Sequence, residues 1–125
     1  MQHPNLNPPI KSVCTTANAA TSSNPVFIIE TYVNGTSWYR KYSDGTIVQG
    51  GFCTELGQDK EWSVPFVTPF TTANAKVFIT PVFNGNPSSV QGGDAVSAVY
   101  TDSFTIHGDT YINVTAGYYW EATGV

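Results

Sequence analysis

Apolar residues fall into short runs along the chain after residue 25, and several of these runs alternate with polar positions. They never recur for long at the i, i+3, i+4 and i+7 spacing of an amphipathic helix. Gly, Asn, Asp and Pro separate the runs, as is typical of turns between strands. The pattern predicts strands at residues 26–33, 36–42, 46–53, 61–66, 76–83, 95–100, 103–107, 110–114 and 118–122.

Glycine and proline positions refine this pattern. Asn34-Gly35 and Asp44-Gly45 predict tight hairpin turns, because they tolerate positive φ. Gly50-Gly51 indicates a bulge or a close approach of the backbone. Pro65 has no amide donor, so its strand is expected at a sheet edge or ending at a bulge. We therefore expect an all-β fold, either an antiparallel β-sandwich or a barrel, built mostly from hairpins.

The N-terminal part of the chain has a different character. Residues 1–25 are rich in Asn, Pro, Thr, Ser and Ala and show no sustained apolar period. They are interpreted as a linker or as the end of a longer shaft. Residues 26–125 are expected to form one domain around a single core, since 125 residues match one domain.

Composition excludes several classes of partner. Charged residues make up only 11% of the chain, against about 25% in an average soluble domain, whereas aromatic residues are plentiful. The net charge of −4 leaves no basic face for phosphates, so a nucleic-acid partner is not expected. No stretch reaches the roughly 20 apolar residues that span a bilayer, and the N-terminus lacks the order of a secretion signal. Membrane insertion is not expected.

The two cysteines, Cys14 and Cys53, are expected to be free thiols, although an intrachain or an interchain bridge stays open. Without a His/Cys cluster they are too few for a structural zinc site. No metal and no cofactor is expected.

The run from Trp38 to Gly51 closely resembles a motif near the start of C-terminal tip domains in the tail fibres of tailed bacteriophages. The matching residues are Trp38, Tyr39, Arg40, Tyr42, Ser43, Asp44, Gly45, Gln49, Gly50 and Gly51. The resemblance extends more weakly to residues 26–125, and the chain departs from the family pattern at Thr46 and Val48.

This resemblance implies a lectin-like β-sandwich that forms a homotrimer at the tip of a virion tail fibre, assembled in the host cytoplasm. It implies binding of a bacterial surface receptor, either a glycan or an outer-membrane protein, during host attachment. A domain that only trimerises and caps a fibre is the main alternative.

The hairpin motif has two possible roles. Trp38, Arg40 and Tyr42 share one strand face, and Tyr39 and Lys41 share the other. The motif residues are interpreted as structural, in the core or a subunit contact, with Arg40 covering aromatic rings or pairing with a carboxylate. Stacking of a sugar on the aromatic rings stays open. We expect Trp38, Phe78 and Trp120 to be largely buried.

Receptor-binding candidates lie nearer the C-terminus. Tyr118 and Trp120 share a strand face and are expected in the core, which leaves Tyr119 on the other face. Tyr100 and His107 lie close to turns. The polar segment 84–94 is expected to be a recognition loop, with candidate residues Asn84, Asn86, Ser88, Ser89, Gln91 and Asp94.

Catalytic motifs are missing from the sequence. It contains no Gly-x-Ser-x-Gly elbow, phosphate-binding glycine loop or His-Glu-x-x-His, and its histidines are only His3 and His107. A carboxylate pair that cleaves glycans is not excluded, because its spacing depends on the fold. We expect a binding protein rather than an enzyme.

Overall fold

A computed structural model describes residues 11–13, 25–54, 60–83, 94–108 and 115–125. The described residues form nine strands: β1 (Lys11–Val13), β2 (Ile28–Asn34), β3 (Ser37–Tyr42), β4 (Ile47–Cys53), β5 (Lys60–Pro65), β6 (Lys76–Phe83), β7 (Ala95–Val99), β8 (Ser103–Gly108) and β9 (Thr115–Gly124). Within these ranges, no helix is long and apolar enough to cross a membrane.

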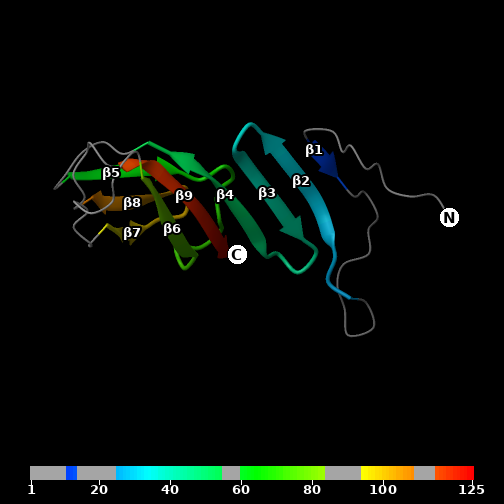
Figure 1. Cartoon of the computed structure of the whole chain (residues 1–125). Coiled ribbons are helices and arrows are strands. Elements are labelled where there is room, and N and C mark those ends of the chain that lie inside the picture. Colours follow the sequence, from blue (N-terminus) through cyan, green and yellow to red (C-terminus); the bar gives the residue numbers. More distant parts are fainter. Residues whose placement is uncertain (1–10, 14–24, 55–59, 84–93, 109–114) are drawn as a thin grey trace.

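The strands form two antiparallel sheets. Sheet A has six strands in the order β1-β2-β3-β4-β9-β6, and sheet B has three in the order β5-β8-β7. Sheet B packs against the part of sheet A formed by β4, β9 and β6, while β1, β2 and β3 extend beyond it (Figure 1). We call these three strands the arm. The predicted antiparallel β-sandwich is confirmed, with an arm on one side.

The core lies between the two sheets. Tyr118, Trp120 and Ala122 of β9 are buried against residues of sheet B, among them Phe104 and Ile106, which are fully buried. The Phe66 ring meets the Phe70, Phe104 and Trp120 rings at centroid distances of 4.9 to 5.9 Å. Such aromatic packing supplies much buried apolar area from few residues. The alternation of Tyr118, Tyr119 and Trp120 places only the middle one outside, as predicted.

The glycine-containing turns join the strands as the sequence predicts. Gly35 and Gly45 both have positive φ, at 62° and 93°. The backbone N–H of Thr46 donates to Asp44 Oδ1 at 2.9 Å, and hydrogen bonds to Thr46 are the main cause that lowers the pKa of Asp44. The pairing between β3 and β4 continues through Gly50 without a register shift, so this glycine marks a close approach rather than a bulge. Pro65 ends β5, which is an edge strand of sheet B.

Two expectations need correction. Phe78 is 68% exposed, because alternation along β6 points Val77 and Ile79 into the core and Phe78 outward. Trp38 is only half-buried, because it lies on the side of sheet A that sheet B does not cover. Within the segment interpreted as a linker or the end of a shaft, Lys11–Val13 forms a short strand that pairs with β2. The strand predicted at 110–114 lies outside the described residues.

Candidate functional site

The two faces of sheet A differ in what covers them. One face packs on sheet B, and the core residues of β9 belong to it. The opposite face has no covering layer in the described part of the chain (Figure 1). We call this second side the outer face.

The strand register arranges the outer face in three rows that run across the strands. The central row consists of Phe78, Glu121, Gly50, Trp38 and Val33, on β6, β9, β4, β3 and β2 in turn. A second row consists of Thr80, Tyr119 and Phe52. The third consists of Lys76, Thr123, Val48, Arg40 and Thr31. Directly opposed residues point to the same side of a sheet, so these side chains share one surface.

Two of these rows carry aromatic side chains. Phe78 is 68% and Tyr119 57% exposed. The Tyr119 ring meets the Phe52 ring at a centroid distance of 5.1 Å and an interplanar angle of 59°. A Cβ atom built on Gly117 would come within 2.6 Å of the Phe52 ring, so this ring lies over the backbone of β9. Exposed aromatic groups held in this way keep their positions without being part of the core.

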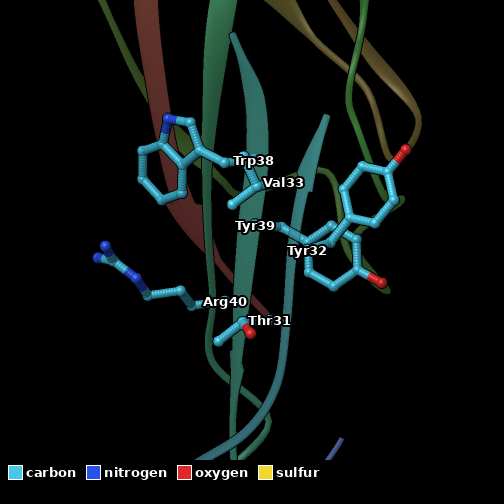
Figure 2. Close-up of a pocket in the computed structure, with 6 residues that line it drawn as sticks. All are labelled: Thr31, Tyr32, Val33, Trp38, Tyr39 and Arg40. Atoms are coloured by element: carbon cyan, nitrogen blue, oxygen red, sulfur yellow. The ribbon is translucent and has the colours of Figure 1, made fainter. Parts of the chain in front are cut away.

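Trp38 lies over a second glycine. A Cβ atom on Gly50 would lie 2.8 Å from the Trp38 ring, so the indole covers the strand next to its own. The Arg40 guanidinium carbon lies 5.1 Å from the centre of that ring. Figure 2 shows Trp38 and Arg40 pointing to one side of the hairpin, with Tyr32 and Tyr39 on the other. A pocket of about 230 Å³ is lined here by Thr31, Tyr32, Val33, Trp38, Tyr39 and Arg40.

Glu121 is the only carboxylate on the outer face in the described ranges. Its strand neighbours are Phe78 on one side and Gly50 on the other. The side chain is exposed, and no ion pair of Glu121 occurs among the described residues. The outer face therefore presents one negatively charged hydrogen-bond acceptor, which lies between aromatic rings.

On the other side of the arm, contacts of Tyr39 hold the two strands of the hairpin together. Tyr39 is buried, its ring stacks on Tyr32 at 5.2 Å and 11°, and its hydroxyl donates to Glu30. The Lys41 ammonium lies 3.6 Å from the Glu30 carboxylate and 5.3 Å from the Tyr39 ring centre. Burial, together with the bond to Glu30, raises the pKa of Tyr39 to about 12. Tyr39 rather than Trp38 is thus the motif residue that fixes the hairpin.

The outer side of sheet B has an ordinary polar surface. Glu61 and Ser63 of β5 are exposed, and Thr105 and His107 lie opposite them on β8. His107 Nδ1 lies 3.7 Å from Glu61 Oε1. The outer side of sheet B is thus polar although the chain as a whole is rich in aromatic residues. The exposed aromatic side chains are concentrated on the outer face of sheet A.

The structure separates the receptor-binding candidates that the sequence predicted. Tyr119 lies on the outer face of sheet A, His107 on the opposite side of the sandwich, and Tyr100 is exposed in the turn after β7. Asp94 accepts a hydrogen bond from the buried Tyr118 hydroxyl. The five other loop candidates, Asn84, Asn86, Ser88, Ser89 and Gln91, lie outside the described residues.

Sequence reasoning missed the neighbours of Tyr119 on the outer face. Phe52, Phe78 and Glu121 join it through strand register, which depends on how distant segments pair. One signal was present in the sequence. Thr80 stands two residues after Phe78, so the two side chains lie on the same face of their strand. A polar residue on that face indicates that the face is exposed to solvent.

The remaining reactive groups do not gather into a centre. No group of three or more His, Cys, Asp or Glu that could hold a metal ion occurs among the described residues. Cys53 is a free thiol, and burial raises its pKa to about 11, which disfavours the nucleophilic thiolate. Cys14 lies outside the described residues.

No protein-family model matches the chain, and no curated protein sequence matches it either. Solved structures do. An N-truncated R2-type pyocin tail fibre superposes with a TM-score of 0.63 at 22% identity, over 81% of this chain and 38% of that one. The C-terminal part of an R2 pyocin fibre of P. aeruginosa gives the same TM-score, 0.63, at 22% identity, over 81% and 26%. An N-truncated R1-type pyocin tail fibre gives 0.59 at 21% identity, over 81% and 86%.

The chain thus spans less than half of the first two fibres. At sequence identities near 20%, the comparison establishes the fold alone. The chain has the fold of the C-terminal part of pyocin tail fibres, which confirms the tail-fibre fold that the motif within residues 36–51 predicts.

Proposed function

We propose that this chain is a tail-fibre domain of a phage or phage-like particle that attaches to a receptor on the bacterial surface. The observation that carries the proposal is the aromatic outer face of sheet A, with Phe78 and Tyr119 exposed. The fold that the chain shares with pyocin tail fibres supports its assignment to the tail fibre of such a particle.

The chemistry of the outer face favours a glycan over an outer-membrane protein as the receptor. Aromatic rings pack against the C–H face of a pyranose and shed water, while hydroxyl and carboxylate groups fix its orientation. Tyr119 and Phe78 supply the rings, Thr80 and Thr123 the hydroxyls, and Glu121 the carboxylate. Aromatic and polar positions alternate across the face, whereas a protein contact of high affinity has a continuous apolar centre.

Binding proceeds without covalent chemistry in this proposal. Cleavage of a glycosidic bond requires two carboxyl groups about 5 to 9 Å apart across the bond. Within the described residues, the outer face carries Glu121 alone, and Glu30 and Asp94 are engaged with Tyr39 and Tyr118 elsewhere.

Self-association is a further part of the proposal, with a homotrimer as the form that the family resemblance implies. The end strands of each sheet, such as β6 and β7, present backbone groups to neighbours. Repetition of weak sites over several chains would strengthen attachment through effective concentration.

A structural capping domain is the second candidate. It is favoured by Ile28 and Val33 of the arm and by Val26 just before it, which are exposed without a covering layer in the described residues. In that case these residues contact other parts of the fibre, and receptor binding is located elsewhere in the parent protein.

Fluorescently labelled protein applied to a panel of bacterial strains separates the two functions. We expect some strains to be stained and Tyr119→Ala to abolish the staining. Tyr100→Ala is the comparison, because Tyr100 is exposed to nearly the same extent, 55% against 57%, but lies in a turn. Loss of staining with Tyr100→Ala and not with Tyr119→Ala would move the receptor contact to that turn. A complete lack of staining across the panel would favour the capping domain.

A further inference from the structure

The central row of the outer face places two aromatic groups at a defined spacing. The Trp38 ring covers Gly50 on β4, and Phe78 stands on β6, with only β9 between these strands. Neighbouring strands lie about 4.8 Å apart, so the two groups are separated by roughly 10 Å across the sheet. Glu121 occupies the position between them.

This spacing matches an extended glycan that runs across the strands. A pyranose unit of such a chain is about as long as one strand spacing, roughly 5 Å. If one unit stacks on Phe78 and the next but one contacts Trp38, the unit between them faces Glu121. A single sugar reaches only one of the two aromatic groups.

Charge indicates what the middle unit carries. Glu121 has no ion-pair partner within the described residues, and the aromatic rings around it favour cations through their π faces. The face already holds one cation in this way, since the Arg40 guanidinium lies over Trp38. Arg40 and Lys76 both stand in the neighbouring row, and neither forms an ion pair with Glu121.

We propose that the outer face of sheet A binds a linear glycan of at least three units, with a protonated amino sugar opposite Glu121. The inference rests on the proposed receptor-binding function and names the ligand class of the same surface. Phe78 holds one outer unit by stacking, Trp38 contacts the other beside the Arg40 guanidinium that lies over its ring, and the carboxylate of Glu121 selects the ammonium group of the middle unit.

Three saccharides test the proposal in calorimetric or NMR titrations at pH 6, where the amines are protonated. They are glucosamine, a trimer of glucosamine, and the same trimer with every amine acetylated. We expect the free-amine trimer to bind about five- to tenfold more tightly than the acetylated trimer, since an exposed ion pair and a cation–π contact each contribute modestly. Glucosamine alone should bind more weakly than either trimer.

Variants assign the effect to the central row. Glu121→Gln keeps the shape and a hydrogen-bond acceptor, and it should remove most of the difference in affinity between the two trimers, because only the cation–π contact remains. Phe78→Ala should weaken the binding of both trimers. It should change the affinity for glucosamine much less. Glu61→Gln removes an exposed glutamate on the other side of the sandwich and should change nothing. Near-UV circular dichroism checks that each variant stays folded.

Several results would overturn the inference. They are equal binding of the acetylated and free-amine trimers, a preference for the amine that is undiminished in Glu121→Gln, equal affinity for one unit and three, and no binding of either trimer. If Phe78→Ala instead lowers the molecular mass of an oligomer, the outer face is a contact between copies of the chain. Cell staining that depends on Tyr119 would keep the receptor-binding function even if the amine preference fails.

Discussion

Gln49 is the single fully buried polar side chain among the described residues, and its contacts tie β4 to the segment after β5. Its Nε2 donates to the Thr68 carbonyl at 2.7 Å, and its Oε1 accepts from the Thr68 backbone N–H at 3.0 Å. Gln49→Leu leaves both backbone groups without these partners, so the free energy of unfolding should fall by about 1–3 kcal/mol in urea titrations. Thr68→Ala is the control, because it keeps both backbone groups. A loss below about 0.5 kcal/mol for Gln49→Leu would mean that water replaces the side chain.

Tyr39 makes the stability of the arm fall as the pH rises through the alkaline range. Its pKa is about 12 in the folded chain and 10.0 when unperturbed, chiefly because of burial and then the bond to Glu30. The folded state therefore holds the phenolic proton more tightly, and this contribution is complete below pH 10 and is lost as the pH rises toward 12. Melting temperatures measured across that window should fall less steeply for Tyr39→Phe than for the parent chain. Equal slopes for the two proteins would contradict the assignment.

Single residues show where sequence reasoning is reliable. The local alternation of Tyr118, Tyr119 and Trp120 was sufficient to predict which side chain is exposed. For Trp38 and Phe78, alternation distinguishes the two faces but does not tell which face a second sheet covers. That depends on sheet B, whose strands come from distant parts of the chain. Aromatic character alone was therefore a poor guide to burial.

At the scale of elements, the arm and the sandwich should respond differently to the loss of an aromatic side chain. Trp38 is half-buried on the outer face, so Trp38→Ala should cost about 1–2 kcal/mol of unfolding free energy, whereas Phe104→Ala in the core should cost about 3–5 kcal/mol. Urea denaturation of both variants gives the comparison. Equal losses would show that the outer face is covered in solution.

Hairpins were the most predictable elements. The strands on either side of Asn34-Gly35 and Asp44-Gly45 lie within two residues of their predicted bounds, because the turn chemistry is local. The pairing of β9 between β4 and β6 has no such local signal. It brings Phe52, Phe78 and Glu121 into one surface, so the candidate site could not be predicted beyond Tyr119. The short strand β1 was missed because three residues give no period to detect.

At the scale of the whole molecule, the first prediction concerns association. One chain of 13.5 kDa leaves the outer face and the arm uncovered in the described residues, and such apolar surface favours contact between copies. Sedimentation equilibrium at micromolar concentration should give about three times the mass of one chain if the homotrimer forms. A monomeric mass would restrict the proposal to a domain that trimerises only through other parts of a fibre.

The second prediction at this scale concerns valency. A shallow surface with a few exposed rings offers little buried area, so we expect one chain to bind a glycan with a dissociation constant in the millimolar to micromolar range. Coupling of many chains to one bead should raise the apparent affinity for a stained strain by about 10²- to 10⁴-fold, because rebinding becomes intramolecular. Tyr119→Ala should abolish attachment of the beads as well as of the free chains, since multivalency multiplies an existing contact and creates none. Beads that carry Tyr119→Ala and still attach as well as the parent would place the receptor contact outside the outer face, on the arm or in a segment beyond the described residues.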